Sequence, residues 1–134
     1  MDLDLDKYEI GFFHLGMPFD GDDRIIESLG YSIIIRSGRV FGIRARFSNY
    51  YSEGSCFNDA LIREQKDLPE PRFITPELIL ELYGELVDQW DDDVERNYQF
   101  IDGNVRVEFS WHQSANGNLI LNYVDIEIEN LQLC

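Results

Sequence analysis

The sequence predicts an α+β protein in which antiparallel β-hairpins form a curved or sandwich-like sheet, with one amphipathic helix packed on it. Three observations carry this prediction. Apolar and polar residues alternate with period two in both halves of the chain, and tight-turn residues separate the alternating segments. In one segment only, at about residues 75–91, apolar residues recur at helical steps. The 134 residues, 44% of them apolar, suit a single domain spanning 1–134.

The first half of the chain is expected to be β. Residues 8–15 form a short aromatic and aliphatic run that ends at Gly16, which predicts one strand. Residues 31–36 and 39–48 flank Ser37-Gly38, a two-residue loop typical of a hairpin because glycine tolerates positive φ. Its second strand has a period of two, with one face in water. The residues on one face are Phe41, Ile43, Ala45 and Phe47, and those on the other are Val40, Gly42, Arg44 and Arg46.

Residues 49–74 follow no clear pattern, and within them residues 60–66 suit either a strand or one helical turn. The helix is then expected to begin at Thr75, a good N-cap, because Pro76 suits the first helical position and Glu77 complements the helix dipole. Its apolar stripe comprises Ile79, Leu82, Tyr83, Leu86, Val87 and Trp90. The stripe predicts a helix that ends near Asp91 and a Trp90 that lies in the core.

Period two returns after the helix. Residues 98–101 lead through Asp102-Gly103, a favoured hairpin loop, into an alternating strand at 105–112 that places Trp111 in the core. A turn at 114–118 precedes a last strand at 119–129. In that strand the apolar residues change parity, which predicts either a β-bulge near Tyr123 or burial of both faces.

Charge is the strongest functional indication in the sequence. The net charge is −15, and residues 67–95 hold ten acids against Arg72 alone. This charge excludes an ordinary nucleic-acid binder and a binder of anionic membranes, and it favours a basic protein partner. The candidate contact residues lie on the expected helix face and at its C-terminal end: Glu77, Glu81, Glu85, Asp88, Asp91, Asp92 and Asp93. As a helix face they would destabilise the fold, and the alternative interpretation is a solvated surface that serves solubility.

No pattern predicts catalysis. His14 and His112 lie in expected strands without partners at metal-ligand spacing. A calcium loop that began at Asp20 would need glycine at its sixth and glutamate at its twelfth position, where the chain has Ile25 and Tyr31. No nucleotide-binding glycine motif or nucleophile elbow occurs, and no base is indicated near Cys56. We therefore expect no enzymatic activity, no cofactor and no metal site.

One aromatic group needs a separate interpretation. Tyr50, Tyr51 and Phe57, close to Arg44 and Arg46, could form a platform on which nucleic-acid bases stack. The negative charge of the chain argues against it. We expect instead that the two arginines pair with carboxylates of the protein itself.

The second half resembles a known family. The resemblance is carried by Phe73–Leu78 opening a helix with Leu82–Leu86, then by Tyr98–Phe109 and Gly117–Leu121. Over about residues 39–129 this order is similar to that of the small WapI-type immunity proteins and related bacterial families. The resemblance implies an intracellular antitoxin that neutralises a secreted toxin domain, often a basic nuclease, by covering its active site. No contact residue carries over, because these families share no general binding motif.

These observations lead to one hypothesis and two alternatives. The chain has no apolar run of roughly 18 residues and starts with alternating aspartates, so we expect a cytoplasmic protein that does not enter a membrane. The leading hypothesis is an immunity-type protein, monomeric or weakly dimeric, that binds a basic toxin. The alternatives are a phage-type nucleic-acid mimic directed against restriction or CRISPR systems, and a small enzyme or ligand-binding domain with a pocket between sheet and helix.

Overall fold

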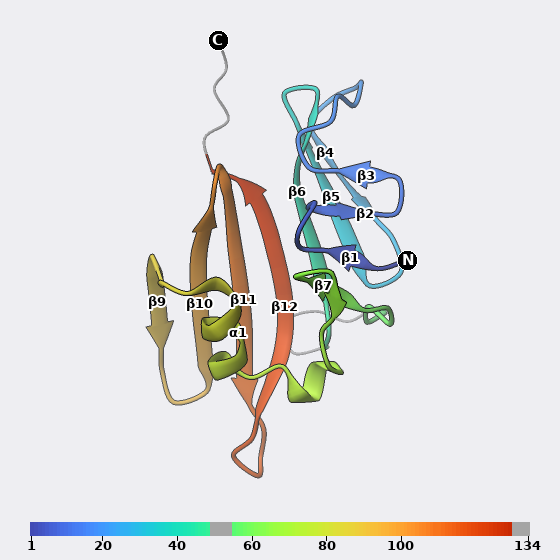
Figure 1. Ribbon diagram of the computed structural model, residues 1–134. Helices are drawn as coiled ribbons and strands as arrows, with labels where there is room; N and C mark the ends of the chain where they lie inside the picture. The colour runs from blue at the N-terminus through green and yellow to red at the C-terminus, as the bar shows by residue number, and fades with distance from the viewer. Residues whose placement is uncertain (49–54, 130–134) are drawn as a thin grey trace.

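The computed structural model describes residues 1–48 and 55–129, which form two sheets and one α-helix (Figure 1). The α+β class expected from the sequence is confirmed. The larger sheet is antiparallel throughout, in the order β4-β5-β6-β12-β11-β10-β9. Its strands are β4 (Arg24–Glu27), β5 (Tyr31–Arg36), β6 (Arg39–Arg46), β9 (Asp88–Asp91), β10 (Glu95–Asp102), β11 (Val105–Gln113) and β12 (Leu119–Ile128).

The smaller sheet has the order β3-β2-β1-β7-β8. Its strands are β1 (Leu3–Asp4), β2 (Glu9–Ile10), β3 (Phe13–His14), β7 (Leu61–Arg63) and β8 (Lys66–Asp67), and β1 pairs with β7 in parallel. The expected single strand at 8–15 is wrong, because the chain reverses at Gly11, whose φ is +54°, and makes a hairpin. The segment 60–66 contributes a strand rather than a helical turn, whereas residues 49–54 lie outside the described part of the chain.

One face of the larger sheet carries the core. In Figure 1, α1 (Pro76–Tyr83) lies over β10 and β11, and the smaller sheet lies over β4, β5 and β6, on that same face. The Tyr83 ring stacks on Phe100 with centroids 5.1 Å apart. The indole nitrogen of Trp111 donates to the carbonyl of Ile74 at 2.8 Å, just after the 3₁₀ turn η1 (Pro71–Phe73). The opposite face of the large sheet is therefore left to polar side chains.

The helix begins as expected and ends early. Thr75 caps it, since its hydroxyl oxygen accepts from the Leu78 amide at 3.2 Å. Gly84 ends it with a φ of +81°, its own amide donating to the Leu80 carbonyl. The expected extension to Asp91 is wrong, because the chain straightens after Gly84 and pairs with β10 as strand β9. The placement of Trp90 in the core is wrong as well, because its side chain is 45% exposed on that strand, whereas Trp111 is fully buried.

The hairpins and the bulge follow the sequence pattern closely. The loop at Ser37-Gly38 joins antiparallel partners, as expected, and so does the expected second loop, which lies one residue later, at Gly103-Asn104, because Asp102 still pairs with Val105. Opposite Ser110 and Trp111 in β11, strand β12 contains the extra residue Asn122, which confirms a bulge beside Tyr123. A second irregularity makes Phe41 the extra residue of β6, so that Val40 rather than Phe41 enters the core. The sequence did not predict strand β4.

Candidate functional site

The face of the larger sheet opposite α1 is polar and highly ordered. The strand register aligns Arg44, Asp125, Glu108, Gln99 and Asp88 as successive neighbours across β6, β12, β11, β10 and β9. Within the described residues, every buried polar side chain lies on this face: Ser32, Asn97, Ser110, Asn122 and Asp125. Buried polar groups need hydrogen-bond partners, so this face must contain a connected network.

That network begins at Arg44. Its guanidinium donates to Asp125 at 2.8 Å and lies over the ring of Tyr123, 4.2 Å from the ring centroid. The Tyr123 hydroxyl donates to Glu108, which also accepts from the amide of Asn97 at 3.0 Å. The side chains of four neighbouring strands, β6, β12, β11 and β10, therefore hold one another in place.

Arg46, the last residue of β6, makes a second set of contacts next to that of Arg44. It donates to the hydroxyl of Ser32 at 2.6 Å and forms an ion pair with Glu27 at 3.2 Å. Both arginines thus pair with carboxylates of the protein, as the sequence predicted. Phe57 is buried and packs against Phe47, so it offers no ring to a base, while Tyr50 and Tyr51 lie outside the described residues.

Asp125 has the most strongly shifted pKa among the described carboxyl groups of this polar face. Its burial raises the pKa to about 7, and the attraction of Arg44 offsets this effect only in part. One of its oxygens, Oδ1, is buried without a hydrogen-bond partner. Neighbouring side chains cover this carboxyl, so that the side chain is only 5% exposed.

A second polar cluster joins the two layers of the fold. Arg63 of β7 donates to Asp102 at 3.2 Å and to the carbonyl of Leu5 at 2.9 Å, and it lies over the Tyr83 ring. Tyr8 donates to the same carboxylate, and burial raises the pKa of its hydroxyl. This cluster links the smaller sheet, α1 and the end of β10.

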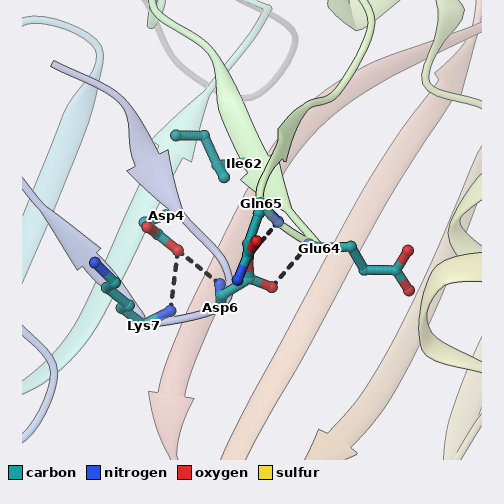
Figure 2. A pocket seen from close by; sticks show the side chains of 6 residues that line it. All are labelled: Asp4, Asp6, Lys7, Ile62, Glu64 and Gln65. Carbon is teal, nitrogen blue, oxygen red and sulfur yellow. Dashed lines mark hydrogen bonds between the residues drawn. The ribbon is translucent and has the colours of Figure 1, made fainter.

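A hollow beside the smaller sheet is lined by Asp4 and Asp6, whose carboxylates accept hydrogen bonds from backbone amides (Figure 2). Asp6 accepts from the amides of Glu64 and Gln65, each at 2.8 Å, and Asp4 accepts from the amides of Asp6 and Lys7. These acids stabilise two turns. Among the described residues, no group of three or more histidines, cysteines, aspartates or glutamates could hold a metal ion.

The surface around β9 has a different character. Strand β9 is the last strand of the larger sheet, and all four of its residues are exposed. Exposed apolar side chains, Val87, Trp90 and Val94, alternate here with carboxylates. We call this region the β9 surface: Val87, Asp88, Trp90, Asp91, Asp92, Asp93, Val94 and Glu95.

Two hollows of about 370 Å³ each adjoin the β9 surface, and Glu95 lines both. The Trp90 hollow is lined by Arg44, Arg46, Ser48, Trp90, Glu95, Asn122 and Tyr123. The aspartate hollow is lined by Asp91, Asp92, Asp93, Val94, Glu95, Arg96, Gln113, Gly117 and Leu119. An exposed indole therefore stands beside a concentration of negative charge.

The carboxylates of the aspartate hollow differ in what they bind. Asp91 pairs with Arg96 at 3.0 Å. Asp92 accepts from the amides of Val94 and Glu95, at 2.9 and 2.8 Å, and so shapes the turn between β9 and β10. Within the described ranges, Arg96 is the one base that lines this hollow, so its net charge is negative.

The seven acids expected on one helix face and at its C-terminal end are all exposed, but they do not lie on one helix. Glu77 and Glu81 lie on α1, and Glu85 lies in the connection that follows. Asp88 and Asp91 belong to β9, and Asp92 and Asp93 to its turn. The structure brings Asp91, Asp92 and Asp93 together, whereas none of the three glutamates lines the aspartate hollow. The expected penalty against a helix dipole does not arise, because α1 ends at Tyr83.

No protein-family model matches this chain, and the searches of curated proteins and of solved structures also found no match. Across residues 1–48 and 55–129, no helix is both long enough and apolar enough to cross a membrane.

Proposed function

We propose that this chain is an acidic, non-enzymatic inhibitor of the immunity type, which binds a basic protein partner in the cytoplasm through its β9 surface. One observation carries the proposal. Trp90, a large apolar side chain, remains 45% exposed at the outer edge of the larger sheet, and carboxylates surround it.

This combination suits protein recognition. Tryptophan is enriched among the few interface residues that contribute most of the binding free energy, and the contacts that surround such a residue in the complex exclude water from it. The surplus carboxylates of the β9 surface would accelerate encounter with a basic partner and reject acidic ones. A nuclease is such a partner, because a surface that binds phosphates is basic. An acidic face that covers this surface would block the substrate.

The proposal is tested by capturing partners of the tagged protein from its native cells at low and at high salt. We expect one stoichiometric basic protein, and we expect high salt to weaken its retention because screening reduces attraction between exposed charges. Trp90→Ala should weaken binding by at least tenfold. Phe12→Ala is the matched control, because Phe12 is 83% exposed on the smaller sheet, away from the β9 surface.

Inhibition of the captured protein's activity by the wild-type chain would then identify it as the toxin. Recovery of no basic protein at either salt concentration would contradict the proposal. An equal loss of binding in both alanine variants would show that the partner does not bind through the β9 surface.

A further inference from the structure

We infer that the Trp90 hollow receives an arginine side chain of the basic partner, with the guanidinium stacked on the indole and paired with the carboxylate of Glu95. The inference rests on the proposed function, since the arginine belongs to that partner. It assigns an occupant to a hollow that lies beside a half-exposed ring.

The charges that line the hollow favour a cation. Arg44 is paired with Asp125 at 2.8 Å, and Arg46 with Glu27 at 3.2 Å. Their donors are thereby directed into the polar face of the sheet. Glu95 has no ion pair among the described side chains, so its charge is the uncompensated one in this hollow. The neighbouring aspartate hollow, which shares Glu95, adds further negative potential.

The indole of Trp90 favours a guanidinium over other cations. A planar guanidinium stacks on an aromatic face and can still donate two parallel hydrogen bonds to a carboxylate, whereas an ammonium group is a compact, strongly hydrated charge. The same packing already occurs on the wall of this hollow, where Arg44 lies 4.2 Å from the centroid of the Tyr123 ring. Trp90 and Glu95 flank the turn from β9 to β10 and together offer a ring and a carboxylate.

The size of the hollow is consistent with a side chain. Pockets for small molecules range over ~300–1,000 Å³, and a volume of about 370 Å³ falls near the lower limit. Because every residue of β9 is exposed, a partner can reach the hollow without displacing any part of that strand.

The inference can be tested without the partner by recording the indole N–H signals of the two tryptophans by NMR. The probe is N-acetyl-arginine amide, and N-acetyl-citrulline amide is its neutral isostere. We expect arginine to shift the Trp90 signal saturably, with millimolar affinity, and citrulline to leave it unchanged. Trp111 is the internal control, since it is fully buried and its indole nitrogen is bonded to Ile74.

A matched pair of variants locates the charge. Glu95→Gln should weaken arginine binding at least threefold, whereas Asp22→Asn, which removes the same charge from an exposed site beyond the opposite edge of the larger sheet, should change it by less than twofold. A Trp90 signal that stays in place with arginine, or that moves equally with citrulline, would overturn the inference. If a basic protein is captured but arginine does not move Trp90, only the hollow's assignment fails. If arginine binds and no protein is captured, the proposed function fails.

Discussion

The guanidinium of Arg44 meets the carboxylate of Asp125 at 2.8 Å across strands β6 and β12, with the arginine side chain 39% exposed and the aspartate 5% exposed. The contact is therefore asymmetric. Arg44 keeps part of its hydration, whereas Asp125 gives up nearly all of its own. Burial of an ion pair can weaken a fold when desolvation exceeds the attraction between the charges. The raised pKa of Asp125, about 7, shows that desolvation dominates here.

This relationship predicts how stability changes with pH. The folded pKa of Asp125, about 7, lies above its ordinary value of 3.8, so the native state binds more protons than the unfolded state between these values. The contribution of Asp125 to the free energy of unfolding is therefore full below pH 4, falls as pH rises to about 7, and stays low above it. Asp125→Asn removes this titration. Relative to the wild type, the variant should gain on the order of a few kcal/mol between pH 4 and pH 8.

The measurement is urea unfolding of both proteins at several pH values. Asp93→Asn, which neutralises an exposed carboxylate, serves as the control for the general effect of removing one negative charge. Parallel stability profiles for the wild type and Asp125→Asn would show that Asp125 ionises normally in the folded protein.

Two glycines with positive φ predict very different responses to alanine. At Gly30, with φ of +82°, an added Cβ would lie 2.2 Å from the backbone nitrogen of Phe57, which is held by a hydrogen bond to the Arg46 carbonyl at 2.6 Å. At Gly38, with φ of +71°, an added Cβ meets nothing within 4 Å. Gly38→Ala should cost about 1–2 kcal/mol, the strain of the left-handed conformation alone. Gly30→Ala should exceed about 4 kcal/mol, as measured by urea unfolding. Equal costs would mean that Phe57 is not packed against Gly30.

The turn between β7 and β8 predicts a stabilising substitution. Glu64 and Gln65 both have positive φ, 57° and 63°, in a two-residue hairpin loop that favours Asn-Gly. Asp6 compensates by accepting from both of their amides (Figure 2). Glu64→Asn combined with Gln65→Gly should stabilise the protein by about 0.5–2 kcal/mol.

The bracing role of Asp6 can be measured in a double-mutant cycle. Asp6→Ala should cost about 1–3 kcal/mol in the wild type, because two backbone amides lose a charged acceptor. The cost should be smaller in the Asn-Gly variant, whose loop needs less support. If Asp6→Ala costs the same in both backgrounds, Asp6 does not compensate for the strain of the turn.

Much of the fold could be predicted because its signals are local. Thr75-Pro76 marks the start of α1, and the glycine loops at 37–38 and 103–104 mark two hairpins through backbone preferences that need no tertiary context. Strand β9 could not be predicted in this way. Leu86, Val87 and Trp90 continue the helical spacing of α1, and only Gly84 indicates its end. Pairing with β10 determines the conformation there.

In the candidate site, too, some features follow from the local sequence and others depend on tertiary pairing. The exposure of Asp91, Asp92 and Asp93 follows from their charge, because carboxylates without buried partners stay in water. The Trp90 hollow depends on register, which places Trp90 opposite Asn97 and Tyr123 opposite Ser110. No local pattern specifies those pairings. The pairing of Arg44 with Asp125 likewise joins residues that are distant in sequence, and charge balance could predict only that some carboxylate would be used.

The last prediction concerns the three aspartates after Trp90. At a helix C-terminus all three would destabilise the fold, whereas in the turn after β9 they make different contacts. Asp92 accepts from the amides of Val94 and Glu95, so Asp92→Ala should cost about 1–2 kcal/mol, as the loss of a helix cap does. Asp93 makes no such contact among the described residues, and relief of like-charge repulsion should leave Asp93→Ala within about 0.5 kcal/mol of the wild type. Thermal unfolding of the two variants at low salt measures the difference. A stabilised Asp92→Ala would contradict the turn described here. If the prediction holds, partner binding should be compared through Asp93 and Glu95, since the loss of Asp92 would alter the turn that carries them.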